Sequence, residues 1–199
     1  MANTGRIRMA GSVGAVGGAL WVIVLMAEVV AHRAVYDSTA GYRVWEALLI
    51  LVQALLLVGV VGLAWSGAAG AGWLGRIGLG LAFLGRTSFL LGELRSFIQG
   101  SDDGLFVPLG ALVTGLGMLL VGIATVRARR WGGWHRIMPL LTGLYPFVAM
   151  FPILAITGEP PAPMIALWGL LWLLLGLALH AEAGAARVLP RSAAASAYS

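Results

Sequence analysis

PMIALWGLLWLLLGLALHA, residues 163–181, is a run of 19 residues without a single Asp, Glu, Lys or Arg. An α-helix rises about 1.5 Å per residue, so a helix of this length covers nearly all of the roughly 30 Å of hydrocarbon in a lipid bilayer. Its only ionisable side chain, His180, lies next to its end. The run therefore predicts a helix that crosses a membrane.

Five further apolar runs precede this one. Together they predict six membrane helices, at about residues 9–31, 44–66, 73–98, 104–126, 137–157 and 163–181. Of the 199 residues, 60% are hydrophobic and 11% are charged, and the mean hydropathy is +0.92. A water-soluble core of this size cannot bury so much apolar surface, so lipid must be the solvent. The predicted fold class is an all-α, polytopic membrane bundle of six transmembrane helices, formed by residues 1–182.

The arginines between the runs predict how the bundle is oriented. One side of the membrane would carry nine of the 13 arginines, namely Arg6, Arg8, Arg76, Arg127, Arg129, Arg130, Arg136, Arg187 and Arg191. The other side would carry Arg33, Arg43 and Arg95. Because basic loops stay on the cytoplasmic side, both termini are expected in the cytoplasm. The Ala- and Ser-rich residues 183–199 are expected to form a disordered cytoplasmic tail.

Two charges interrupt the third run, in FLGRTSFLLGELRSF, residues 83–97. Arg86 falls near the middle of the predicted helix and Glu93 two turns later. A charge near the bilayer centre costs about 2.5–3.5 kcal/mol on insertion scales, so each needs a partner, water or a route to the interface. Residues seven apart lie about 10 Å apart along a helix, so each partner is expected on another helix.

The acidic residues supply candidate partners. Glu28, Glu46 and Glu93 all fall within about two turns of the predicted outer ends of their helices. We therefore take Glu28, Glu46, Arg86 and Glu93 as a candidate ligand or ion site that opens outward. Interfacial anchoring is the alternative for Glu28 and Glu46, and a structural ion pair is the alternative for Arg86 and Glu93.

Two prolines interrupt the fifth run, in TGLYPFVAMFP, residues 142–152. Proline has no backbone donor, so Pro146 and Pro152 release the carbonyls of Thr142 and Val148. A helix kinked in this way could wall an apolar cavity, and a simple packing kink is the alternative. The candidate cavity-wall residues are Thr142, Tyr145, Pro146, Phe151, Pro152, Trp168 and Trp172.

Composition and spacing argue against several kinds of site. The absence of cysteine excludes disulfides, thiolate metal sites and a Cys nucleophile. Glu28 and His32 have the i, i+4 spacing of a metal-ligand pair, but nothing supplies a third ligand, so neither a metal nor a cofactor is expected. The arginines that give a pI of 10.7 lie between apolar runs, so nucleic acid is not an expected partner. No catalytic residue is assigned.

A resemblance adds to this interpretation. LGMLLVGIATVRARRWGGWHRIMPLLTGL, residues 116–144, combines a GxATxRA helix end with a Trp-containing basic loop, and LLLVGVVGLAW (55–65) and ALWGLLWLLLGLAL (166–179) are Leu/Gly helices. These segments resemble a broad group of uncharacterised six-helix integral membrane proteins of GC-rich bacteria. The resemblance implies the six-helix fold and a place in the bacterial cytoplasmic (plasma) membrane. It carries over no activity.

Two classes of function fit these residues. The favoured one is a transport, sensing or accessory membrane protein in which Glu93, balanced by Arg86, binds a proton, a small cation or a basic ligand from outside. The alternative is an integral-membrane enzyme that acts on a lipophilic substrate with glutamates as acid and base. A structural subunit remains a third reading. The lipid bilayer is the expected partner, and self-association or a partner in a membrane complex stays open.

Overall fold

A computed structural model describes residues 2–101, 104–158 and 160–185 of the chain. Its helices, in chain order, are α1 (Ala2–Tyr36), α2 (Thr39–Ser66), α3 (Trp73–Gln99), α4 (Phe106–Ala128), η1 (His135–Ile137), α5 (Met138–Tyr145), η2 (Pro146–Met150), α6 (Phe151–Thr157) and α7 (Ala162–Ala185). Of the expected tail, residues 183–185 belong to α7, and residues 186–199 lie outside the described residues.

Six helical segments are long and apolar enough to cross a membrane. They are Thr4–His32, Thr39–Ser66, Trp73–Gln99, Phe106–Ala128, His135–Thr157 and Ala162–Ala185. The fifth segment is a composite of η1, α5, η2 and α6, whereas each of the others belongs to a single helix. The predicted all-α bundle of six membrane helices is confirmed.

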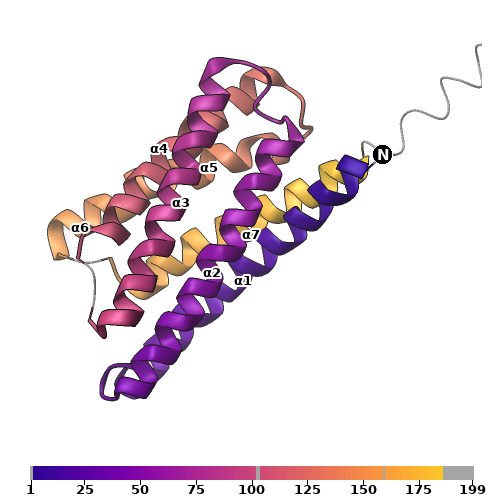
Figure 1. The fold of residues 1–199 in the computed structure, drawn as a ribbon. Coiled ribbons are helices and arrows are strands. Elements are labelled where there is room, and N and C mark those ends of the chain that lie inside the picture. The colour runs from indigo at the N-terminus through magenta and orange to yellow at the C-terminus, as the bar shows by residue number, and fades with distance from the viewer. Residues whose placement is uncertain (1, 102–103, 159, 186–199) are drawn as a thin grey trace, which may run out of the picture.

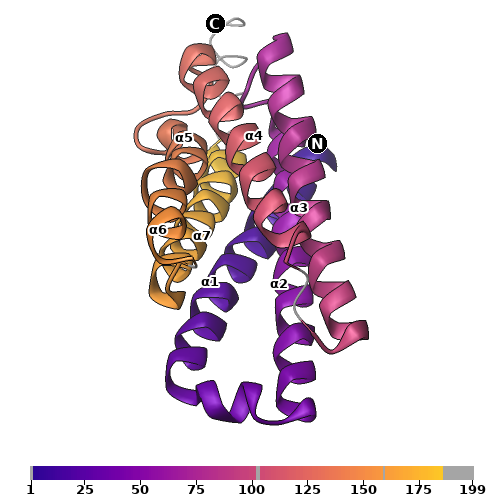
Figure 2. The ribbon, with the colours of Figure 1, turned by 90° about the vertical axis from the view of Figure 1, so that its left-hand side faces the viewer.

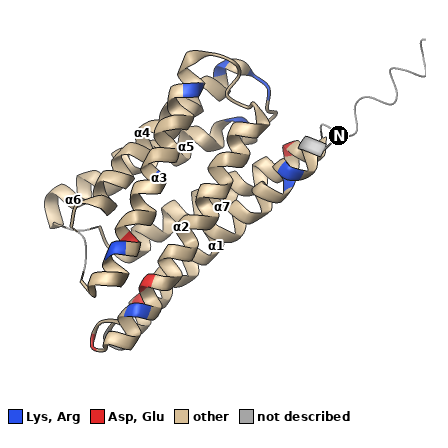
Figure 3. Cartoon of the chain, in the orientation of Figure 1, with Lys and Arg blue, Asp and Glu red and all other residues tan. Residues whose placement is uncertain are grey.

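The start of α1 and the end of α7 lie at the same end of the bundle (Figure 1). We call this the terminal end; it also carries the α2–α3 and α4–α5 connections. The opposite, distal end carries the connections α1–α2, α3–α4 and α6–α7. Figure 2 shows that α1 and α2 project beyond the other helices at the distal end. Most of the basic residues gather toward the terminal end, and most of the acidic ones toward the distal end (Figure 3).

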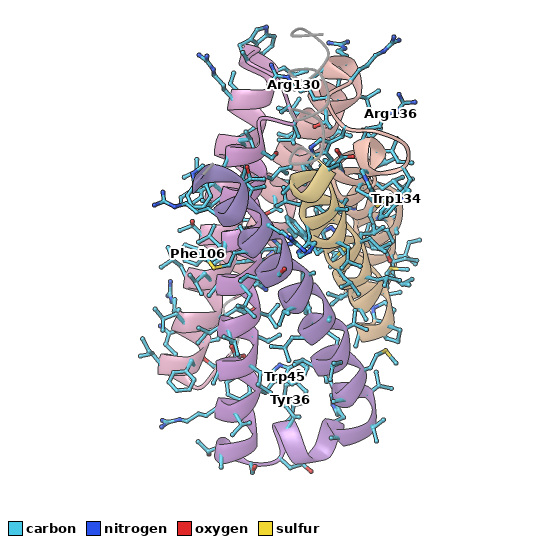
Figure 4. All side chains as sticks on the ribbon, turned by 90° about the vertical axis from the view of Figure 1, so that its right-hand side faces the viewer. Tyr36, Trp45, Phe106, Arg130, Trp134 and Arg136 are labelled. Carbon is cyan, nitrogen blue, oxygen red and sulfur yellow. The ribbon has the colours of Figure 1, made fainter. Side chains whose placement is uncertain are left out.

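Aromatic and basic side chains mark the two ends of the bundle. Arg130, Trp134 and Arg136 lie at the terminal end and Tyr36 and Trp45 at the distal end (Figure 4). Trp134 is about half exposed, in the manner of a ring at the lipid headgroups, whereas Trp45 is buried between helices. The terminal end is therefore more basic than the distal end, and its tryptophan Trp134 is placed to contact lipid headgroups.

Small residues let the helices approach closely. A Cβ added to Gly18 of α1 would lie 2.3 Å from the backbone nitrogen of Leu173 in α7, and one added to Gly117 of α4 would lie 2.3 Å from that of Ala82 in α3. Lipid offers no hydrophobic drive for helix association, so such backbone contact supplies much of the attraction. The extensive α1–α7 and α3–α4 contacts result from it.

Candidate ligand site around Arg86

Arg86 lies in the middle of α3 and exposes none of its surface. The adjacent Gly85 is in backbone contact with α4, because a Cβ there would lie 2.4 Å from the nitrogen of Thr114. Successive residues of a helix differ by about 100° in direction. The contacts of the Arg86 side chain are accordingly with α1, α2 and α7, in addition to its own helix.

Four aromatic rings surround the guanidinium, and we call them the aromatic cage. The distances from Arg86 Cζ to the ring centres are 4.1 Å for Trp172, 4.9 Å for Trp21, 4.9 Å for Trp168 and 5.3 Å for Phe89. The cage is itself packed, with ring centres 5.3 Å apart for Trp21 and Trp168 and 6.1 Å apart for Phe89 and Trp168. A desolvated cation–π contact contributes about 2 kcal/mol, so several together offset a large part of the cost of burial.

Gln53 supplies the hydrogen bond of Arg86 within the described part of the chain. Arg86 Nη1 donates to Gln53 Oε1 at 2.7 Å, and Gln53 is itself 1% exposed. Since the amide oxygen accepts from the guanidinium, the amide nitrogen must point elsewhere. Gln53 thus fixes one corner of Arg86 from α2.

Several buried donors around Arg86 have no acceptor among the described residues. They are Arg86 Nε, Arg86 Nη2, Gln53 Nε2 and Trp172 Nε1, and we call them the donor set. Each is an N–H group that can donate but not accept. A buried donor without an acceptor costs about 1–3 kcal/mol. The chemistry of this site is therefore suited to a group with acceptor atoms.

An apolar cavity of about 240 Å³ borders the cage on its distal side. Three cage rings, Trp21, Phe89 and Trp168, form its inner wall, so each faces both the guanidinium and the cavity. The rest of the wall comes from the turns at the distal end and from α4, η2, α6 and α7, with Gly104, Val107, Pro108, Ala111, Met150, Phe151, Leu154, Pro160 and Ile165. We call this space the distal cavity.

The proline-containing fifth span helps to position this wall. Pro146 cannot donate to Thr142 O, and Trp168 Nε1 of α7 donates to that carbonyl instead, at 2.9 Å. The chain then forms the wider π turn η2, in which the Phe151 nitrogen donates to Pro146 O. Tyr145 OH donates to Met164 O at 2.8 Å and joins α5 to the start of α7. The irregular span thereby holds Trp168 in the cage.

The seven candidate wall residues have different positions. Phe151 and Trp168 line the distal cavity, and Trp172 belongs to the cage. Thr142 and Tyr145 bind α7, as described above, and Pro146 is buried beside Gly115 of α4. Pro152 is exposed on the outside of α6.

The three candidate glutamates lie apart from the guanidinium. Glu46 and Glu93 are buried, at 5% and 6% exposure, and Glu28 is half-buried. Over the described ranges, none of the three forms a hydrogen bond or an ion pair with Arg86. The structure therefore brings Arg86 together with aromatic rings and an amide instead of a carboxylate.

Glu28 has a partner of its own at the distal end. Tyr36 OH donates to Glu28 Oε1 at 2.9 Å. Tyr36 lies beyond the apolar span that ends at His32, and burial, followed by the bond to Glu28, raises the pKa of its phenol. Glu28 thus stabilises the turn of chain that leads into α2.

Three residues around Arg86, namely Trp21, Gln53 and Phe89, are not among those predicted from the sequence. Trp21 and Gln53 each carried a signal. Trp21 lies at mid-span, although tryptophans favour the membrane interface, and Gln53 is the one amide inside an apolar run of the sequence. A polar or amphipathic residue at mid-depth indicates a site in the bundle interior.

A second polar cluster lies at the terminal end. Arg8 Nε donates to His180 Nε2 at 3.0 Å, and His180 Nδ1 lies 2.7 Å from Ser12 Oγ. Because Nε2 accepts, Nδ1 carries the proton, and His180 cannot act as a base toward the Ser12 hydroxyl. His135 Nδ1 lies 2.7 Å from Glu182 Oε1 and joins the α4–α5 connection to α7. Both contacts are structural ties between segments.

No group of three or more His, Asp or Glu side chains in the described ranges could hold a metal ion. Comparison of the chain with protein-family models, with curated proteins and with solved structures finds no match.

Proposed function

We propose that this chain is a ligand-binding protein of the bacterial cytoplasmic membrane, in the transport, sensing or accessory class, and that its ligand occupies the distal cavity. The wider finding on which this rests is a multi-pass membrane protein with Glu46, Arg86 and Glu93 buried in its bundle. The arginines at the terminal end support an orientation in which the termini are cytoplasmic and the distal cavity lies in the outer half.

One observation carries the proposal. A fully buried guanidinium, whose Nε and Nη2 have no acceptor among the described residues, lies directly behind the wall of an apolar cavity. Small-molecule sites commonly combine an apolar cavity with a few convergent polar groups. Intramembrane charges of this kind commonly mark a substrate or ligand path. The donor set favours a ligand with acceptor atoms, whereas the sequence alone favours a proton, a small cation or a basic ligand at Glu93.

Photo-crosslinking tests the proposal. Purified protein in lipid nanodiscs would be irradiated with methyl palmitate that carries a diazirine, and the modified peptides would be mapped by mass spectrometry. We expect adducts on cavity-lining residues, in addition to adducts on lipid-facing positions. The cavity-lining residues of these segments are Val107, Pro108, Ala111, Met150, Phe151 and Leu154.

A cavity-filling variant provides the control. Ala111→Phe, at a buried position of the cavity wall, should remove the cavity adducts and leave the lipid-facing ones. Leu112→Phe, at an exposed position of the same helix, should leave both. Adducts confined to lipid-facing positions in the parent protein would refute ligand binding in the distal cavity.

A further inference from the structure

The charge of Arg86 restricts the chemistry of the ligand. A guanidinium stays protonated in proteins, so the centre of the bundle holds a positive charge. Its contacts among the described residues are four aromatic rings and the neutral amide of Gln53. A neutral acceptor would satisfy the N–H groups and leave the charge uncompensated. An anion would satisfy the N–H groups and would also compensate the charge.

The free edge of the guanidinium restricts the chemistry of the ligand further. Nη1 is engaged by Gln53, whereas Nε and Nη2, which lie side by side on one edge, are both in the donor set. That edge presents two parallel N–H bonds, the arrangement that matches the two oxygens of a carboxylate. Gln53 Nε2 and Trp172 Nε1 are further buried donors, on two of the helices that contact Arg86. The hydrogen-bonding pattern is that of a receptor for a planar oxyanion.

The cavity supplies the place for an apolar tail. Trp21, Phe89 and Trp168 form one continuous wall between the distal cavity and Arg86. Trp168 is fixed by its bond to Thr142 O, whereas Phe89 has no polar anchor. Phe89 contacts the guanidinium on one side, at 5.3 Å from ring centre to Cζ, and lines the cavity on the other.

We propose that the Nε/Nη2 edge of Arg86 binds a carboxylate, and that this carboxylate is the head of a lipophilic acid whose tail fills the distal cavity. The inference rests on the proposed function and names its ligand class. The same carboxylate chemistry could come from a small free acid in water, and the experiment separates the two sources.

Competition for the cavity adduct measures this specificity. The adducts of the diazirine ester on the cavity-lining residues Val107, Pro108 and Ala111 are followed, and unlabelled palmitate, methyl palmitate and acetate are added as competitors. Because the readout is the cavity adduct alone, binding of competitors at the lipid-facing surface does not contribute. We expect palmitate to compete at a concentration about tenfold lower than methyl palmitate, since a charge-assisted bidentate pair replaces a neutral contact.

Two variants place the effect at Arg86. Arg86→Gln should abolish the preference for palmitate over its ester. Gln53→Glu, which sets a carboxylate of the protein itself against Arg86, should abolish it as well and keeps the test valid where Arg86→Gln fails to fold. Arg76→Gln, at an exposed position of the same helix, should retain the full preference.

The outcomes are distinct. Equal competition by palmitate and methyl palmitate in the parent protein overturns the carboxylate site and leaves ligand binding in the cavity intact. A preference that survives both Arg86→Gln and Gln53→Glu overturns the role of Arg86. If acetate displaces the adduct at the same concentrations as palmitate, the carboxylate site at Arg86 stands, but the inference that its ligand is a lipophilic acid is refuted. The absence of any cavity adduct in the parent protein before competitors are added refutes the proposed function itself.

Discussion

Arg86 shows how a guanidinium can be buried at mid-membrane by π faces and one amide. The rings come from α1, α3 and α7 and the amide from α2, so the site depends on four helices at once. The sequence predicts that a charge at this depth needs compensation from another helix. It does not predict which group provides it, because that depends on how helices rotate against each other, and spacing along one helix carries no such information.

Tyr36 and Glu28 give a residue-scale prediction about pH. Burial and the Glu28 bond raise the pKa of the Tyr36 phenol, so the folded state holds this proton more tightly than the unfolded state. Its contribution to stability is complete below the ordinary tyrosine pKa of about 10 and is lost as the pH rises through the higher value of the folded state. Ultraviolet difference absorbance should show Tyr36 among the tyrosines that titrate late.

Two variants check that assignment. Tyr36→Phe should reduce the late absorbance change by the contribution of one tyrosine, and Glu28→Gln should move that contribution toward the ordinary range, because the bond to the carboxylate contributes to the shift. A late absorbance change of unaltered size in Tyr36→Phe would contradict the assignment.

At the scale of elements, the fifth span replaces a backbone hydrogen bond, which Pro146 cannot form, with a contact to α7. Pro146 predicts a released carbonyl at Thr142, and the structure gives that carbonyl the indole N–H of Trp168. The existence of the break can be predicted from proline chemistry alone. The new partner of the Thr142 carbonyl could not be predicted. Trp168 lies on α7, 26 residues further along the chain, and the packing of the whole bundle places it beside Thr142.

A double substitution tests this contact. Trp168→Phe leaves Thr142 O buried without its donor and should lower the free energy of unfolding by about 1–3 kcal/mol in addition to the lost ring area. Pro146→Ala restores a backbone N–H that can bond to Thr142 O. In the Trp168→Phe background it should recover part of the loss, as measured by unfolding in mixed detergent micelles. Purely additive effects would show that the two positions are not linked.

The α1–α7 contact gives a second prediction at this scale. Gly18→Ala should destabilise the protein strongly, because its Cβ would lie 2.3 Å from the Leu173 backbone nitrogen. Gly80→Ala is the matched control. Nothing lies within 4 Å of a Cβ there, so it should be neutral or stabilise by up to about 1 kcal/mol through helix propensity. Thermal unfolding of the two variants checks this, and equal stability would contradict the close packing.

At the scale of the whole molecule, the lengths of the apolar runs predict the six spans, and the placement of the arginines predicts the orientation. Six spans follow from composition, since a bilayer requires runs of about 20 apolar residues and internal backbone hydrogen bonds. Close helix packing is shown by the contacts of Gly18 and Gly117 with neighbouring helices. The order of helices around Arg86 could not be predicted, because six apolar helices have many arrangements of similar hydrophobic burial.

The orientation is a prediction for intact cells. The chain has no cysteine, so single cysteines can be introduced without background. Ser101→Cys at the distal end should react with a membrane-impermeant thiol reagent, whereas Ala71→Cys in the α2–α3 connection should react only after the cells are opened. Labelling of position 71 alone in intact cells would invert the topology and place the distal cavity in the inner half.

Within the residues that the structure describes, Arg86 is held by Gln53 and the aromatic cage and not by a carboxylate of the bundle. Double-mutant cycles on the free energy of unfolding, with Arg86→Met, Gln53→Leu and Glu93→Gln, test this arrangement. We expect a coupling free energy of about 1.5–3 kcal/mol between Arg86 and Gln53, as for a hydrogen bond to a charged group. Between Arg86 and Glu93 we expect a coupling free energy below about 0.5 kcal/mol. A large coupling free energy to Glu93, with none to Gln53, would show that a carboxylate holds Arg86 instead.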